Sequence, residues 1–316
     1  MATNNAIEVT NLEKGYKGVP VLHDVSFTVE QGTVFALLGA NGSGKTTTIN
    51  ILTTLIKADG GTARIAGFDV ATQPSKVREQ ISLTGQFAAV DHVLTARENL
   101  QLMGELRHLD DPAQTAEDLL DKFDLKDAAD RRLMTYSGGM RRRLDIAMSL
   151  VGDPPIIFFD EPTTGLDPRG RSEMWLTIRT LAEKGTTTFL TTQYLEEADR
   201  LADRIAILHG GTVAVVGTSD ELKKLVPPGL VELDFDDDER LSVALGALGE
   251  HHEVSRSESK LVIATSGSVA EMADVFIRLK NAGVEPIGFS RQIPSLDDVY
   301  FKILDDEKED GHASTL

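Results

Sequence analysis

The segment GANGSGKTT, residues 39–47, is the feature that most constrains what this chain can fold into. It follows the short apolar run VFALL and precedes a helical pattern over residues 44–55. The segment matches the phosphate-loop pattern of glycine, four residues, glycine, lysine, and then serine or threonine. In that motif a strand ends in a glycine-rich turn, and backbone N–H groups at the start of the next helix converge on phosphate oxygens. The sequence therefore predicts a strand–loop–helix unit that binds a nucleotide.

The residues of this loop have different predicted roles. Lys45 is expected to reach the β- and γ-phosphates, and the Thr46 hydroxyl is placed to ligate Mg²⁺. Backbone N–H groups of the loop are expected to contact the phosphate oxygens. The predicted nucleotide-binding residues of the loop are Gly39, Ala40, Asn41, Gly42, Ser43, Gly44, Lys45, Thr46 and Thr47.

A second segment, IIFFDEPTTGLDP at residues 156–168, ends an apolar run in two adjacent carboxylates. Four apolar residues in a row are typical of a strand that is buried on both faces. Asp160 is expected to hold Mg²⁺ directly or through water, and Glu161 to polarise the attacking water. The alternative is two surface carboxylates that cap a strand. It is disfavoured because the phosphate loop predicts bound Mg²⁺ and phosphates beside this strand end, which explain two carboxylates at a semi-buried position.

The order of patterns along the 316 residues predicts two domains, since the chain is too long for one ordinary core. Short apolar strands alternate with helices, which predicts a parallel α/β sheet with a helical insertion. Residues 228–316 carry 19 acidic and 8 basic residues, a shift that coincides with the segment LVPPGLVE. The predicted divisions are an ATP-binding domain at 1–227 with a helical subdomain at about 87–150, a small α/β domain at 228–304, and a disordered tail at 305–316.

Composition excludes several classes of function. The net charge of −18 argues against a general nucleic-acid-binding surface. No stretch is long and apolar enough to predict a membrane span, and the N-terminal MATNNAIEVT lacks the features of a secretory signal. The chain has no cysteine, so disulfide and thiolate chemistry are not expected.

A third segment, YSGGM at residues 136–140, decides the family. The phosphate loop, this segment and DEPTTGLDP, in that order, resemble the ATP-binding-cassette (ABC) ATPases over about residues 6–225. The resemblance implies an α/β P-loop NTPase core with antiparallel β and helical subdomains, in which two copies enclose two Mg·ATP. Residues 136–140 form the signature segment, and in this arrangement the signature segment of one copy closes over the nucleotide held by the other. Ser137 and the amides of Gly138 and Gly139 are the expected donors.

The same resemblance implies roles for four further residues. Tyr16 matches the aromatic that stacks on adenine, and Gln86 the glutamine that touches Mg²⁺ and the γ-phosphate and communicates with the membrane subunit. Asp167 matches the residue that bridges the two copies. Gln193 stands where most of the family has a histidine, and glutamine donates an N–H but takes up no proton. This glutamine, Met140 and the ending PSLDDVYFKI resemble the drug-exporter ATPases of the daunorubicin-resistance type.

The predicted protein is therefore the ATPase subunit of an exporter, peripheral on the cytoplasmic face of the membrane. Its expected cofactors are ATP and Mg²⁺, and its expected partners are a second copy and a separate permease, without nucleic acid. The predicted catalytic residues are Glu161, Gln193 and Lys45, and the predicted metal ligands are Thr46, Gln86 and Asp160. The transported compound stays open.

Two alternatives belong to other classes. One is a soluble ABC ATPase that acts on ribosomes or nucleic acid. It is disfavoured because one cassette is present and only 91 residues separate Lys45 from Ser137, too few for a long coiled coil. The other is a non-catalytic regulatory cassette, which the presence of Lys45, Asp160 and Glu161 argues against.

Three weaker features are interpreted without assigning them a separate binding site. The basic run Arg141–Arg143 is interpreted as a solvated or nucleotide-facing helix edge rather than a nucleic-acid site. The pair His251–His252 is interpreted as part of a loop rather than a metal site. The acidic segment at 234–239 lacks calcium-loop spacing and is interpreted as a solvated turn.

Overall fold

The computed structural model describes residues 5–85, 90–226, 229–249, 254–257, 260–265, 268–292 and 294–313. It divides into two compact units, Met1–Ser219 and Asp220–Leu316. The sequence predicts a boundary after residue 227, so the division lies earlier than expected. Each unit has its own core and is described by itself.

The first unit is built on a six-stranded sheet with the order β10-β9-β3-β8-β7-β6. The sheet is parallel except for β10, which pairs with β9 in the antiparallel sense. Every residue of β3, β7 and β8 is buried, which confirms the prediction of strands covered on both faces. The strands are β3 (Val34–Leu38), β6 (Ile81–Thr84), β7 (Ile156–Asp160), β8 (Thr187–Thr192), β9 (Arg204–His209) and β10 (Thr212–Gly217).

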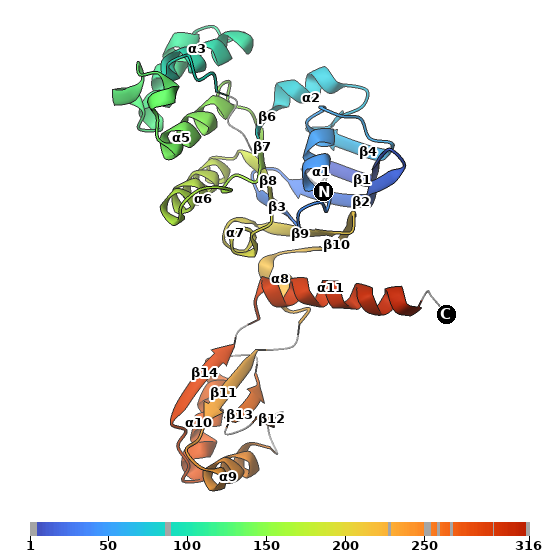
Figure 1. Ribbon diagram of the computed structural model, residues 1–316, viewed down its shortest axis with the longest axis vertical. Coiled ribbons are helices and arrows are strands. Elements are labelled where there is room, and N and C mark those ends of the chain that lie inside the picture. The colour runs from blue at the N-terminus through green and yellow to red at the C-terminus, as the bar shows by residue number, and fades with distance from the viewer. Residues whose placement is uncertain are drawn as a thin grey trace. The chain divides into compact units, whose positions relative to one another are not determined.

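One face of this sheet is covered by helix α1 and by a smaller antiparallel sheet, as Figure 1 shows. Phe27 from the smaller sheet stacks with Phe35 and Phe189 at ring-centroid distances of 5.2 and 5.8 Å. Burial of these large aromatic rings joins the two sheets into one hydrophobic core. The elements are α1 (Lys45–Leu52), α2 (Pro74–Gln80), and the strands β1 (Asn5–Tyr16), β2 (Val19–Glu30), β4 (Gly60–Ile65) and β5 (Phe68–Asp69).

Helices α6 (Pro168–Glu183) and α7 (Leu195–Leu201) lie on the opposite side of the large sheet from α1 (Figure 1). Between β6 and β7 the chain forms a helical subdomain, which confirms the predicted helical insertion. Its helices are amphipathic, and Thr95 and Glu98 form a capping box at the first of them. The subdomain contains α3 (Ala96–Leu106), α4 (Pro112–Lys122), α5 (Gly138–Ser149) and the 3₁₀ turns η1 (Lys126–Ala128) and η2 (Leu133–Thr135).

The second unit contains a four-stranded antiparallel sheet with the order β12-β13-β11-β14. With two helices in the chain order βαββαβ, this is the ferredoxin-like arrangement. Alternate apolar residues of β11 and β13 pack against the helices, including Leu233, Leu261 and Ile263. The elements are β11 (Leu230–Asp234), α9 (Asp238–Leu248), β12 (Val254–Ser257), β13 (Lys260–Ala264), α10 (Val269–Asn281) and β14 (Gly288–Gln292).

Two helices account for the differences from the predicted division of the chain. The division falls within helix α8 (Ser219–Lys223), because the residues of α8 after Ser219 group with the second unit. In that unit Lys302 donates to the carbonyl of Leu225 at 2.7 Å. Helix α11 runs from Leu296 to Ala313, so helix extends through residues 305–313, where the sequence predicts disorder. The run LDDEKED is charged but has no proline or glycine, and leucine, lysine and glutamate favour helix.

Candidate functional site

Three strand ends of the large sheet bring the predicted site residues together. The phosphate loop follows β3, Asp160 is the last residue of β7, and Gln193 comes directly after β8. Strand β8 lies between β3 and β7, and the three strands are parallel. The carboxyl ends of adjacent parallel strands meet at one edge of the sheet, where α/β proteins bind ligands. The sequence predicted each of these segments, and the topology places them side by side.

The phosphate loop has the backbone geometry that its glycines were predicted to allow. Gly44 has φ of 109°, a conformation that other residues rarely adopt, and it precedes the first residue of α1. A Cβ atom at Gly39 would clash with the carbonyl oxygen of Leu208, and one at Gly44 with the side chain of Leu22. The N–H of Gly39 donates to Thr192 at 3.1 Å, which fixes the loop to β8. The loop is thus held in shape by its neighbours in the fold.

Lys45 is the buried cation of this loop. Its side chain is 4% exposed, and Nζ donates to the carbonyls of Gly39 and Ala40 at 2.9 and 3.0 Å. The same Nζ lies 3.3 Å from Glu161 Oε1. A buried ammonium needs such partners because its desolvation is costly. Lys45 therefore links the phosphate loop directly to the carboxylate after β7.

Asp160 and Thr46 bring hard oxygen atoms together. Thr46 Oγ1 is 3.4 Å from Asp160 Oδ1, although the two residues are far apart in the sequence. The Thr191 hydroxyl donates to the same Oδ1 at 2.6 Å and so fixes the carboxylate. A hydroxyl and a carboxylate are donors that Mg²⁺ accepts when phosphates and water complete its coordination. In the part of the chain that the structure describes, no cluster of three His, Cys, Asp or Glu side chains offers another metal site.

Glu161 has an unusual backbone conformation. Its φ is 49°, in the left-handed region that is sparsely populated for non-glycine residues. The conformation is held by its N–H, which lies 3.1 Å from both the carbonyl and the hydroxyl oxygen of Thr191. The Thr164 hydroxyl donates to Glu161 Oε2 at 3.3 Å. Such local strain persists where the surroundings impose it and is common at functional sites.

Thr191 is a site residue that the sequence analysis missed. It is fully buried in β8 and orients both Asp160 and Glu161 through the contacts above. A signal was present, because the strand TTFLTT carries four threonines in a position where all six residues are buried. Buried hydroxyl groups need hydrogen-bond partners, so threonines in a central strand indicate polar neighbours.

The signature segment and the segment after Glu161 line one cleft of about 530 Å³. Ser137 and Asp167 are the N-caps of α5 and α6, and accept from the N–H groups of Met140 and Gly170 at 3.2 and 2.7 Å. A Cβ atom at Gly138 or at Gly139 would meet no other atom within 4 Å. Space inside the single chain therefore does not require glycine at these two positions. No phosphate-loop residue lines this cleft.

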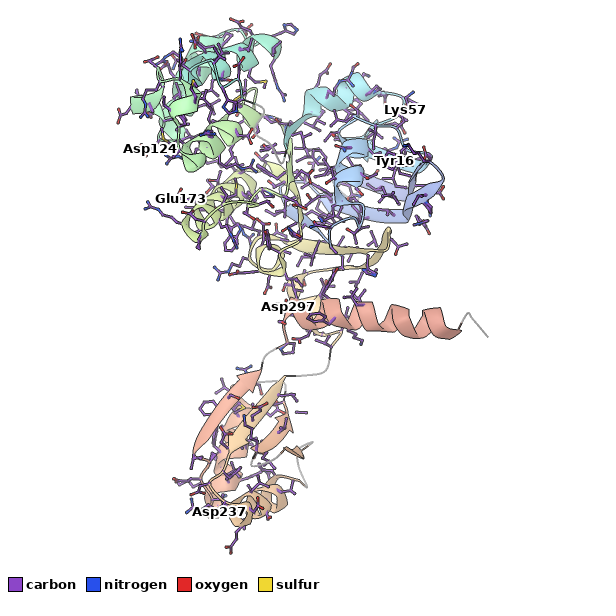
Figure 2. The ribbon with its side chains drawn as sticks, viewed as in Figure 1. Tyr16, Lys57, Asp124, Glu173, Asp237 and Asp297 are labelled. Atoms are coloured by element: carbon purple, nitrogen blue, oxygen red, sulfur yellow. The ribbon has the colours of Figure 1, made fainter. Side chains whose placement is uncertain are left out.

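Tyr16 and Gln86 are the two remaining residues predicted to contact the nucleotide, and the structure describes the first of them. Tyr16 ends β1 and is 45% exposed, and Lys14 Nζ lies 5.6 Å from the centre of its ring. Figure 2 shows it on the antiparallel sheet of the first unit. Its ring is thus accessible, and its role in adenine binding stays a prediction. Gln86 lies outside the described residues, as does the pair His251–His252.

The three arginines of the basic run are engaged within the protein. Arg141 donates to the carbonyl of Tyr136 at 3.0 Å, and Arg142 forms an ion pair with Asp145 at 2.9 Å. Arg143 lies 3.9 Å from Asp124. These contacts oppose the interpretation of the run as a free basic surface for nucleic acid.

The family model described as ABC transporter matches residues 22–164. The daunorubicin resistance ATP-binding protein DrrA2 of Streptomyces coeruleorubidus is 45% identical, with 98% of each chain covered. The Nod factor export ATP-binding protein I of Burkholderia lata is 34% identical over 96% of this chain and 98% of its own. Both similarities extend through the second unit of the structure.

A solved structure is similar over about two thirds of this chain. It is a dimeric ATP-binding cassette in a post-hydrolysis state, bound to ADP and Pi. The TM-score is 0.61 at 26% identity, with 67% of this chain and 98% of that chain covered. The shared fold and the site geometry described above both indicate ATP binding and hydrolysis.

Proposed function

Since this chain belongs to the ABC transporter family of ATP-binding proteins, we propose that it powers the export of a drug-like or other amphipathic compound. It binds and hydrolyses ATP, and the compound crosses the membrane through a separate permease. The observation that carries the proposal is the meeting of Lys45, Asp160 and Glu161 at adjacent strand ends. The relatives named for daunorubicin resistance and for Nod factor export support export as the direction of transport.

The residues of the site have separate proposed roles in ATP hydrolysis. Backbone N–H groups of the phosphate loop and the Lys45 ammonium hold the phosphates and offset their charge. Glu161 accepts a proton from the attacking water and orients it toward the γ-phosphate. Glu161 is fixed for this task by Thr191 and Thr164, which limit its freedom before the substrate arrives.

Thr46 and Asp160 are the residues proposed to hold Mg²⁺. They fit the ion because their oxygens lie close together at the phosphate loop and one carboxylate oxygen is fixed by Thr191. When bound, Mg²⁺ supplies positive charge that neutralises the charge of the phosphates. Gln86 is proposed as a further ligand on the family resemblance alone.

Each ATP is proposed to lie between two copies of the chain. Ser137, Gly138 and Gly139 line a cleft away from the phosphate loop, so a second copy is needed to bring both segments to one nucleotide. The open space beside Gly138 and Gly139 leaves room for phosphates to approach the backbone N–H groups of α5. Asp167, in the same cleft, is proposed to bridge the copies, and Tyr16 to stack on adenine.

The membrane location is proposed to be peripheral, on the cytoplasmic face where ATP is supplied. Among the described residues, no helix has the length and apolar character needed to cross a bilayer. Transport by this account therefore requires a permease partner.

The Gln193 side chain is expected to donate a hydrogen bond to the γ-phosphate. Gln193→Ala should lower ATP turnover by about one to two decades, which corresponds to a charge-assisted hydrogen bond of roughly 1.5–3 kcal/mol. Gln193→His should keep much of the activity and gain a pH dependence near the imidazole pKa of about 6.5. Steady-state ATPase rates between pH 5.5 and 8.5 measure both effects. Full activity of Gln193→Ala would show that this residue is a spectator.

The export function is tested in inverted membrane vesicles that contain this chain and the permease that co-purifies with it. ATP-dependent uptake of doxorubicin, followed by its fluorescence, is expected with the wild type and not with Glu161→Gln. Uptake that does not differ between the two would contradict drug export. Co-sedimentation of the chain with ribosomes instead of membranes would favour the non-transport alternative.

A further inference from the structure

The last residues of strand β1, which ends at Tyr16, are paired irregularly in the small antiparallel sheet. The pairing of β1 with β4 ends where Glu13 meets Gly60, and the pairing with β2 changes register on both sides of Lys14. Among the described residues, the segment 14–16 is paired in the sheet with β2 alone. Register changes of this kind redirect side chains and are common beside active sites. The backbone that carries Tyr16 therefore needs support from outside the strand ladder.

Asp59, in the loop between α1 and β4, provides this support. Its Oδ2 accepts the N–H of Gly15 at 2.8 Å, and its Oδ1 accepts from the Lys14 ammonium at 2.7 Å. Its own N–H donates to the carbonyl of Glu13 at 2.9 Å. One residue thus holds three consecutive residues of β1 that directly precede Tyr16.

The Asp59 carboxylate is charged in this arrangement. The hydrogen bonds from Lys14 and Gly15 hold the pKa of its carboxyl below the ordinary value, so it is ionised at neutral pH. The side chain is 52% exposed, and an exposed ion pair is in general a weak source of stability. The contacts of Asp59 are therefore better explained by the segment that they hold in place.

Lys14 links Asp59 to the aromatic ring of Tyr16. The Lys14 side chain is 14% exposed, and its Nζ lies over the Tyr16 ring at 5.6 Å from the centroid. An ammonium at this distance is attracted by the face of an aromatic ring. Because Asp59 fixes the ammonium, it also fixes where the ring is attracted. A ring with a cation over one face can still receive a flat base on its other face, and Tyr16 is 45% exposed.

The same end of the hairpin is connected to the phosphate loop. Lys14 on β1 is the Cα partner of Leu22 on β2. Leu22 lies against the loop, because a Cβ atom at Gly44 would clash with its side chain. Tyr16 is thus separated by one strand pair from the residues that are proposed to hold the phosphates.

We propose that Asp59 is a positioning residue for nucleotide binding, which holds Lys14 and the end of β1 so that Tyr16 presents its ring to the adenine base. The inference rests on the proposed function, because it assigns Asp59 to the same ATP site. In this account Asp59 contacts neither the base nor the phosphates. Its loss therefore weakens recognition of the base and leaves the phosphate contacts unchanged.

The test compares ATP with inorganic tripolyphosphate, which carries phosphates but no base or ribose. Equilibrium binding of each compound to the full-length chain is measured with the same concentration of Mg²⁺. Asp59→Ala is expected to raise the Kd of ATP about fivefold to tenfold, a part of what the loss of a base–aromatic stack costs. The Kd of tripolyphosphate should stay within twofold of wild type. In steady-state assays KM for ATP should rise while kcat stays within twofold.

Asp69→Ala is the matched control. Asp69 ends β5 in the same sheet, where β4 separates it from β1. It accepts from the N–H groups of Ala71 and Thr72 at 3.0 and 2.9 Å, so the control also removes backbone hydrogen bonds of a turn. Both Kd values should match wild type in Asp69→Ala. Thermal melting of the two variants shows that each is folded.

A double-mutant cycle tests whether Asp59 acts through Tyr16. Tyr16→Ala is expected to raise the Kd of ATP at least as much as Asp59→Ala does. Adding Asp59→Ala to Tyr16→Ala should change this Kd less than twofold further, because no ring remains to be positioned. Asp59→Asn keeps an acceptor for the N–H of Gly15 and should lie between wild type and Asp59→Ala.

Three results would overturn the inference. An unchanged Kd of ATP in Asp59→Ala would show that this residue has no role in binding. Equal rises for ATP and tripolyphosphate would show a general effect on the site, and additive effects in the double variant would show that Asp59 acts independently of Tyr16. These results leave the proposed function intact, whereas a wild type that does not bind ATP would remove the proposed function together with this inference.

Discussion

Glu161→Gln is expected to lower ATP turnover about 10²–10⁴-fold while ATP affinity stays close to that of wild type. The substitution preserves the size of the side chain and its hydrogen bond from Thr164, but an amide cannot accept the proton of the attacking water. Binding should survive because the phosphate loop and Lys45 are unchanged. Steady-state hydrolysis and equilibrium nucleotide binding measure the two effects separately.

The same variant is expected to accumulate an ATP-bound dimer. Two copies still associate around ATP, but they do not hydrolyse it and therefore do not separate. Light scattering with MgATP should detect the dimer at protein concentrations where wild type is largely monomeric. Glu183→Gln, on an exposed position of α6, is the matched control and should behave as wild type. Wild-type turnover in Glu161→Gln would mean that another group takes the proton.

Lys45→Met is expected to abolish detectable turnover and to weaken ATP binding at least tenfold. The substitution keeps an unbranched side chain of similar length but removes the ammonium that contacts the phosphates. The loss of charge-assisted hydrogen bonds is worth roughly 1.5–3 kcal/mol each in binding. It also removes the ion pair with Glu161, so the largely enclosed Glu161 carboxylate is left beside an apolar side chain.

Lys57→Met is the matched control for this experiment, since Lys57 is exposed and follows α1 (Figure 2). It should bind and hydrolyse ATP as wild type does. Thermal melting of both variants separates loss of binding from loss of fold. ATP affinity equal to wild type in a folded Lys45→Met protein would contradict the role assigned to this residue.

Local patterns were enough to predict the parts of the site that depend on one segment. The phosphate loop requires glycine at fixed positions, and Gly39 and Gly44 occupy places where a side chain would clash. The buried strand that ends in Asp160 was indicated by its unbroken apolar run. Both features arise from short-range chemistry that the sequence displays directly.

Features that depend on the tertiary fold were not predictable in this way. The contacts of Thr191 with Asp160 and Glu161 exist because β8 lies beside β7, and no spacing in the chain encodes that neighbour. The contact of Arg142 with the carbonyl oxygen of Gly85 forms only after α5 has packed beside β6. The boundary between the two units likewise lies within α8, and the short sequence of this helix does not indicate it.

The roles of Tyr16, Gln86 and Gln193 came from family resemblance and not from their own surroundings. An exposed tyrosine at a strand end is unremarkable by itself. The position of Gln193 supports its predicted role, because it follows β8, which lies between the strands that lead to Lys45 and Asp160. For these residues the fold supplies the position, and functional measurements must supply the role.

The central claim, that two copies complete each other's ATP sites, is tested most directly by mixing two inactive variants. Lys45→Met disables the phosphate loop, and Gly138→Asp places a carboxylate in open space at the signature, where it should repel phosphate without disturbing the fold.

In a mixed dimer one site combines the intact phosphate loop of the Gly138→Asp copy with the intact signature of the Lys45→Met copy. ATP turnover of an equal mixture is therefore predicted to recover to roughly a quarter of wild type, since about half of random dimers are mixed and each has one intact site. A mixture that stays as inactive as its two components would contradict the claim.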